Sequence, residues 1–257
     1  MITACKYKGV NPKMTEQKKD SPAIVTHLRK NYIKLPEAIK KASGILVNGK
    51  RFKSILFTTD VAIIMNNDAH AVLAVYPFTP HPAIIQSITS VASTLVFAGV
   101  GGGITSGHRS ANISLFAEAH GCAGVVVNAP TPIETIREIE ETVDIPIICT
   151  VVSEFTDIQE KLDAGVDMIN VSGARRTAHI VREIRKQYPD LPIIATGGPT
   201  EESIAETIEA GANAITYTPP ENGVLFSKKM DVYRNQEEQQ YEDDLEEERL
   251  EAEQSNE

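Results

Sequence analysis

A repeated segment constrains this chain more than any other feature. Residues 144–150, DIPIICT, return as DLPIIAT at 190–196, an offset of 46 positions. Residues 164–169, AGVDMI, return at the same offset as AGANAI at 210–215, and Ala123-Gly124 begins a looser copy. Self-similarity of this size indicates one supersecondary unit that is used repeatedly along the chain.

The segment 191–220 shows what that unit is. The apolar run Ile193-Ile194-Ala195 ends at Thr196 and the pair Gly197-Gly198, and a helical pattern follows over Thr200–Ala210. After a stop at Gly211, a second apolar run begins at Ala214. This order predicts a strand, a turn, a helix and a second strand, and a helical crossover makes the two strands parallel.

Counting such strands predicts the architecture. Eight short apolar runs alternate with helical patterns along most of the chain, which favours a closed (β/α)8 barrel, or TIM barrel, over an open doubly wound sheet. Residues Leu35–Ala42 are expected to form a helix that caps the amino-terminal opening of the barrel. The expected strands are Ser54–Thr59, Val72–Tyr76, Leu95–Ala98, Val125–Asn128, Ile147–Thr150, Met168–Val171, Ile193–Thr196 and Ala214–Tyr217.

The ends of the chain differ from its middle. Residues 1–20 are polar and lack the apolar core of a secretory signal, so we expect a disordered arm there, followed by a barrel domain over 21–233. Residues 234–257 contain eleven acidic and two basic residues, so this tail carries nine of the ten net negative charges of the chain. It is expected to be a solvated helix or disordered, with binding of a basic partner as the alternative.

Composition and motifs exclude several classes of protein. No apolar stretch is long enough to cross a membrane, and no basic patch interleaved with aromatics suggests nucleic-acid binding. Three cysteines without a C-x-x-C spacing fit a reducing cytoplasm, and a homo-oligomer is compatible with the sequence. The dinucleotide fingerprint, the P-loop, the Gly-x-Ser-x-Gly elbow and zinc-binding spacings are all absent, so no cofactor or metal is expected.

Catalytic candidates come from the residues that follow each strand, because these converge on one opening in a barrel. Asp60 and Glu154 are candidate proton-transfer groups, although each could instead cap the helix that follows it. Asn128 and Asn170 are matching amides at strand ends, suited to orienting a substrate. Cys149 is expected to be a core residue rather than a nucleophile.

Two loops and one turn are candidates for binding an anion. Gly101, Gly102 and Gly103 precede His108 and Arg109 at a helix start, where backbone N–H groups and a guanidinium could meet an oxyanion. The alternative is a merely flexible turn. Ser172 and Arg175 follow the sixth strand, and Gly197 and Gly198 follow the seventh.

These segments carry a resemblance to known proteins. The ATGG turn at 195–198 and the DIPII, DLPII and AGAN segments resemble the ribulose-phosphate-binding type of TIM barrel, an aldolase-type group of epimerases, aldolases and synthases. The resemblance implies a phosphate near Gly197 and Gly198, but the matching turn after the eighth strand contains Pro219 and Pro220, which donate no N–H. VNAPTP, NVSG and IIATGGPT are also similar to uncharacterised bacterial barrels often labelled hydrolase.

Three functions therefore remain open. The first is an isomerase, lyase or synthase acting on a small anionic metabolite, with phosphorylated metabolites included. The second is a hydrolase that activates water with the same carboxylates. The third is a non-catalytic barrel that senses a metabolite and engages a partner through its acidic tail.

Overall fold

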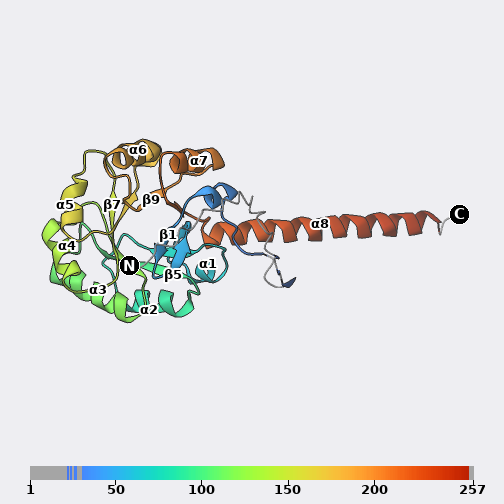
Figure 1. The fold of residues 1–257 in the computed structure, drawn as a ribbon. Coiled ribbons are helices and arrows are strands. Elements are labelled where there is room, and N and C mark those ends of the chain that lie inside the picture. Colours follow the sequence, from blue (N-terminus) through green and yellow to red (C-terminus); the bar gives the residue numbers. More distant parts are fainter. Residues whose placement is uncertain (1–21, 23, 25, 28–30, 255–257) are drawn as a thin grey trace, which may run out of the picture. The chain divides into compact units, whose positions relative to one another are not determined.

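The computed structural model describes residues 22, 24, 26, 27 and 31–254. Residues 32–257 form one compact unit, and every helix and strand labelled in Figure 1 belongs to it. The arm expected over residues 1–20 lies outside the described residues. The expected boundary at 233/234 falls inside a continuous helix, α8 (Asn222–Gln254).

Eight parallel strands close into a barrel in the order β10-β3-β4-β5-β6-β7-β8-β9 (Figure 1). Every neighbouring pair in this ring is parallel, including the closing pair, in which Ile215 of β10 lies opposite Ser54 of β3. The predicted (β/α)8 fold and its strand count are therefore confirmed. The strands are β3 (Ser54–Phe57), β4 (Ala71–Ala74), β5 (Leu95–Gly101), β6 (Gly124–Val127), β7 (Ile147–Val151), β8 (Met168–Val171), β9 (Ile193–Thr196) and β10 (Ala214–Tyr217).

Helices cover the outside of the barrel and bury one apolar face each. In α4, for example, Ile136 and Ile139 are fully buried while Glu140 is exposed, as expected for an amphipathic helix on a sheet. The helices are α1 (Val61–Met65), α2 (Pro82–Val91), α3 (His108–Ala119), α4 (Ile133–Glu140), α5 (Ile158–Asp163), α6 (Thr177–Gln187) and α7 (Glu201–Glu209), with a short 3-10 helix, η3 (Ala174–Arg176), before α6.

The repeated Asp and Asn have a clear structural role. Asp167 accepts a hydrogen bond from the backbone N–H of Ile147 at 2.8 Å, and Asn213 accepts one from Ile193 at 2.9 Å. In both cases the residue before a strand ties down the first residue of the preceding strand. Because both partners are 46 positions apart in the two copies, the sequence repeat reflects a repeated hydrogen bond between adjacent strands.

The amino-terminal opening is filled by a hairpin that was not among the elements expected from the sequence. Strands β1 (Ile45–Val47) and β2 (Lys50–Phe52) pair antiparallel around Asn48 and Gly49, and both turn residues have positive φ. Phe52 is fully buried among residues of the barrel interior, with its ring centroid 5.2 Å from that of Phe97.

Residues Leu35–Ala42, which were expected to cap that opening, lie outside the strands instead. This segment forms a 3-10 helix, η2 (Glu37–Lys41), that packs against α7 and contributes Ala38 and Ile39 to the layer outside the strands. The backbone N–H groups of Glu37 and Ala38 donate to the Glu201 carboxylate at 2.9 and 2.7 Å. The hairpin, and not η2, packs into the barrel interior because the hairpin carries Phe52, a large aromatic side chain that fills this space.

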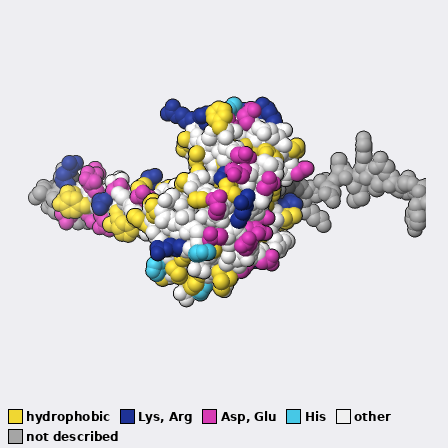
Figure 2. Space-filling view, turned by 90° about the vertical axis from the view of Figure 1, so that its left-hand side faces the viewer, with side chains coloured by type: hydrophobic (Ala, Val, Ile, Leu, Met, Phe, Trp, Pro, Cys, Tyr) yellow, Lys and Arg dark blue, Asp and Glu magenta, His cyan; other side chains and the backbone are white. Residues whose placement is uncertain are grey.

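Helix α8 has few buried side chains. Phe226, Tyr233 and Tyr241 are exposed, while Leu225 and Met230 are half-buried. The acidic segment therefore forms a solvated helix over the part of it that the structure describes. No helix among the described residues is long and apolar enough to span a membrane. Figure 2 shows acidic and basic side chains interspersed on the face that carries α4 and α5.

Candidate functional site

The carboxyl ends of the strands surround a cavity of about 220 Å³, here called the central cavity. Its floor is apolar and its upper wall consists of amides and hydroxyls. This composition arises because β7 to β10 each have an inward-facing polar residue near their carboxyl end and Asn128 directly follows β6, in each case two positions beyond a buried apolar residue. The residues that line the cavity are Phe57, Leu73, Val75, Asn128, Thr150, Asn170, Ser172, Thr196, Thr216 and Thr218.

Two residues that line this cavity each have a buried polar atom without a partner among the described residues. The Asn170 amide donates to the Thr150 hydroxyl at 3.1 Å, but its Oδ1 is unpartnered although the residue is only 6% exposed. Thr216 is 5% exposed, and its Oγ1 is also unpartnered. A buried polar group without a partner costs about 1–3 kcal/mol, so these two atoms are candidates for hydrogen bonds to a ligand.

In the part of the chain that the structure describes, no ionisable side chain lines the central cavity. Asp60 instead caps α1, accepting the backbone N–H groups of Ala62 and Ile63 at 2.8 and 3.2 Å. Glu154 forms an ion pair with Arg176, and its Oε1 lies 3.6 Å from Nε2 of His179. The two carboxylates proposed from the sequence are thus engaged with neighbouring elements.

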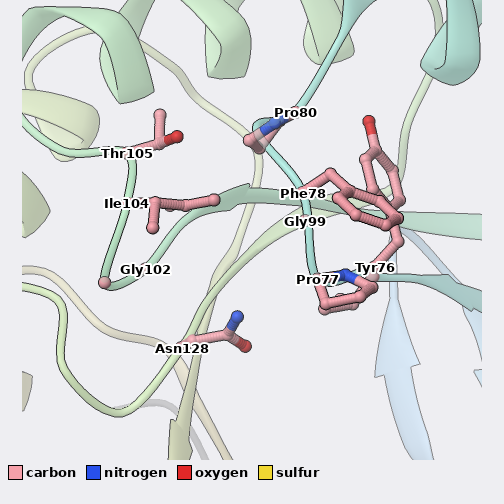
Figure 3. A pocket seen from close by; sticks show the side chains of 12 residues that line it. Tyr76, Pro77, Phe78, Pro80, Gly99, Gly102, Ile104, Thr105 and Asn128 are labelled. Atoms are coloured by element: carbon pink, nitrogen blue, oxygen red, sulfur yellow. The ribbon is translucent and has the colours of Figure 1, made fainter.

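A second hollow of about 210 Å³, the aromatic compartment, adjoins the central cavity and shares Val75 and Asn128 with it. Figure 3 shows Ile104 and Gly102 on one side and Tyr76, Pro77 and Phe78 on the other. Gly101, Gly102 and Gly103 all line it, together with Pro80, Gly99 and Thr105.

The glycine loop approaches other residues closely. A Cβ on Gly101 would lie 2.9 Å from the Ser110 hydroxyl, and one on Gly102 would lie 3.2 Å from the Asn128 amide nitrogen. These two glycines therefore let the loop lie against Ser110 and Asn128. Thr105 on the same loop is only 3% exposed, and its hydroxyl has no partner among the described residues.

A third hollow of about 430 Å³, the arginine compartment, brings together Arg175, Gly197 and Gly198. It shares Thr196 with the central cavity, and Glu206 is the one carboxylate that the described residues contribute to its lining. Both glycines also have structural roles. Gly197 packs where a Cβ would lie 2.7 Å from Ile215, and Gly198 has a φ of +85°.

The remaining anion-binding candidates lie away from these hollows. His108 is highly exposed, and its Nδ1 lies 3.1 Å from the Glu138 carboxylate on α4. Arg109 is exposed in the first turn of α3 and lines none of the three hollows. The structure thus brings Arg175 close to the mouth, together with Asn128, Asn170 and Ser172, but it does not bring His108 or Arg109 into the same lining.

The two described cysteines have no role at the mouth. Cys149 is fully buried in the layer outside the strands, and burial raises the pKa of its thiol. Cys122 is also buried, which raises its pKa to about 12. Among the residues with described placement, no three His, Cys, Asp or Glu side chains are grouped so that they could hold a metal ion.

Sequence reasoning missed Thr216 and Thr105. Thr216 could have been found from the two-residue alternation of β10, because Ala214 faces the barrel interior and the residue two positions further faces the same way. Thr105 carries no comparable sequence signal, since the conformation of its loop decides its burial.

The fold and the mouth define a (β/α)8-barrel protein with a hydrogen-bonding cavity at the carboxyl ends of its strands, where barrels place their sites. No protein-family profile matches the chain. A curated relative, the inosine-5'-monophosphate dehydrogenase of Halalkalibacterium halodurans, is 33% identical over 99 residues, which cover 32% of this chain. The chain spans only about a fifth of that relative's length.

Solved structures share the fold at low sequence identity. A phosphonopyruvate hydrolase, solved with oxalate and Mg²⁺, superposes with a TM-score of 0.56 at 14% identity, over 74% of this chain and 83% of its own. A mandelate oxidase superposes with a TM-score of 0.53 at 14% identity, over 69% of each chain. At such identities these similarities show that the chain has the TIM-barrel fold.

Proposed function

We propose that this barrel binds a small anionic metabolite at its mouth. The observation that carries the proposal is the pair of buried, unpartnered atoms, Asn170 Oδ1 and Thr216 Oγ1, on two residues that line the central cavity. A hydroxyl group of the ligand could donate to the Asn170 oxygen, and its hydroxyl or carbonyl oxygen could pair with the Thr216 hydroxyl. The ligand would thereby remove the cost of two unsatisfied groups.

The arginine compartment would hold the anionic end of the same ligand. It shares the lining residue Thr196 with the central cavity, and Arg175 is the cation that the described residues contribute to its lining. Arginine suits phosphate and carboxylate because its planar guanidinium can donate two parallel hydrogen bonds. The neighbouring Gly197 and Gly198 agree with the phosphate position that the ribulose-phosphate-binding barrels imply, while Glu206 would favour a ligand of modest negative charge.

Catalysis is a second candidate function, and Glu154 is the observation that favours it. One carboxylate oxygen of Glu154 is buried without a partner among the described residues, while the other is held by Arg176. A carboxylate fixed in this way after β7 could transfer a proton in an isomerase, lyase or synthase, or activate water in a hydrolase. Asp60 is less suited to either role because it caps α1.

The binding proposal is tested with glycerol 3-phosphate, which carries hydroxyl groups and a phosphate, and with glycerol as the uncharged comparison. Calorimetric titration should show that Arg175→Ala makes the binding free energy of glycerol 3-phosphate less favourable by about 1.5–3 kcal/mol, the size of a charged hydrogen bond. Thr216→Val should weaken this binding by about 0.5–1.5 kcal/mol, because one neutral hydrogen bond is lost. Arg182→Ala on the exposed side of α6 and Thr89→Val on α2 are the matched controls and should bind normally.

If glycerol 3-phosphate does not bind, or if both test variants bind it as tightly as the controls, the proposed function is wrong. The catalytic candidate is tested with Glu154→Gln, which keeps the shape of the side chain and removes its charge. Conversion of metabolites from a phosphorylated panel should stop in this variant while glycerol 3-phosphate binding persists. Unchanged conversion would exclude Glu154 as the proton-transfer group.

A further inference from the structure

Resting on the proposed function, we infer that the mouth ligand carries a flat aromatic ring, and that this ring occupies the aromatic compartment. The central cavity and the arginine compartment account for hydroxyl and anionic groups, but neither explains the apolar hollow beside them. The inference narrows the ligand from any small anion to one that joins a ring to a polar, anionic portion.

The walls of the compartment carry the inference. Phe78 and Ile104 are 72% and 70% exposed, yet both line a concave hollow next to the mouth. Large apolar side chains left exposed in a concave site are typical of a surface that a ligand covers. Tyr76, Pro77 and Pro80 complete a lining to which the described residues contribute no charged group (Figure 3).

The shape of the compartment favours a rigid ring over a flexible chain. Its volume is about 210 Å³, whereas a cavity of about 150 Å³ already accommodates benzene. Two of its walls are prolines, and the Tyr76 hydroxyl accepts the backbone N–H of His81 at 2.8 Å, which holds that aromatic ring in place. Fixed flat walls make the most contact with a flat ligand, because aromatic rings pack in offset or edge-to-face geometries.

The polar groups of the compartment locate the attachment point of the ring. Asn128 lines both the aromatic compartment and the central cavity, so a polar substituent on the ring could meet the Asn128 amide where the two join. The buried, unpartnered hydroxyl of Thr105 lies across from Pro80 and offers a second hydrogen bond at the rim of the ring. An uncharged donor such as an amide or hydroxyl matches these two groups.

The experiment compares three uncharged amides that differ only in the group beside the amide: benzamide, cyclohexanecarboxamide and acetamide. Dissociation constants come from amide chemical shifts of Gly101, Gly102 and Gly103 during titration of the full-length protein. Benzamide should bind at least about tenfold more tightly than acetamide, and more tightly than cyclohexanecarboxamide. Phe78→Ala should abolish this preference, while Phe155→Ala, equally apolar but 85% exposed and outside the compartment, should preserve it.

Titration of glycerol 3-phosphate into the unmodified protein and into Arg175→Ala, alongside the amide titrations, separates this inference from the proposed function. Benzamide preference that depends on Phe78 supports the ring compartment. Equal binding of the three amides, or no binding of any, overturns the inference, and in that case Arg175-dependent binding of glycerol 3-phosphate would leave the proposed function standing. A Phe78-dependent preference without Arg175-dependent phosphate binding would support the compartment and overturn the anion assignment.

Discussion

At the scale of residues, three of the ionisable candidates from the sequence are engaged by other parts of the protein. Asp60 holds the first turn of α1, Glu154 pairs with Arg176, and His108 faces Glu138. What remains free in the central cavity are neutral amides and hydroxyls, above all Asn170 and Thr216. The site is therefore better suited to recognise hydrogen-bonding groups than to supply a strong acid or base from its own lining.

The two described cysteines give a prediction about reactivity. Burial raises the pKa of Cys122 to about 12 and also raises that of Cys149, and only a thiolate attacks an alkylating reagent. Iodoacetamide at about pH 8 should therefore leave both thiols unmodified in the native protein and modify both after denaturation in guanidinium, as read by mass spectrometry of tryptic peptides. Rapid native labelling of Cys149 would mean that its surroundings open easily or that it is a reactive residue after all.

At the scale of elements, the barrel is held together by side chains at the starts of its strands. Asn213 accepts the backbone N–H of Ile193, and it also accepts a hydrogen bond from Arg185 at 2.8 Å. Arg185 in turn donates to the backbone carbonyls of Gly211 and Leu191. One asparagine and one arginine thus connect the end of α6 with the first residues of β9 and β10.

Removal of Asn213 should weaken the barrel at this point. Asn213→Ala leaves the N–H of Ile193 without its acceptor and removes one of several acceptors of the Arg185 guanidinium, which should cost about 1–3 kcal/mol in the free energy of unfolding. Asn213→Asp keeps the acceptor and matches the Asp167 copy of the repeat, so it should cost less. Urea unfolding followed by circular dichroism measures both, with Asn112→Ala on the exposed face of α3 as the control. If Asn213→Ala lowers the free energy of unfolding no more than the control does, the role of this hydrogen bond is contradicted.

At the scale of the whole molecule, the barrel closes without help from the acidic end of the chain. A layer of helices covers the strands, and η2 from the amino-terminal side packs against α7 and shares its apolar layer. The last helix, α8, leaves its acidic residues and several aromatic side chains exposed.

Truncation after Tyr233 should change the free energy of unfolding by no more than about 0.5 kcal/mol, since surface changes away from packed groups usually stay within that range. The removed residues up to 250 are all exposed, so little burial is lost. Thermal unfolding of the truncated and full-length chains, followed by circular dichroism of the helical signal, measures the difference. A decrease well beyond this range would show that the acidic segment packs against the barrel.

The sequence by itself determined the eight strands of the barrel and their order, because each strand and crossover helix is a local pattern and the 46-residue repeat marks the unit. The β1–β2 hairpin was also within reach of the sequence, since Asn48-Gly49 directly after the apolar run Ile45–Val47 is a strong turn signal. The partners of the rim residues were not determined in this way. Glu154 pairs with Arg176, and Asn170 donates a hydrogen bond to Thr150, so both contacts join segments 20 or more positions apart. The Thr216 hydroxyl, by contrast, has no partner among the described residues. Such contacts depend on how strands and loops pack in space, so only the tertiary structure decided which polar groups stay free to bind a ligand.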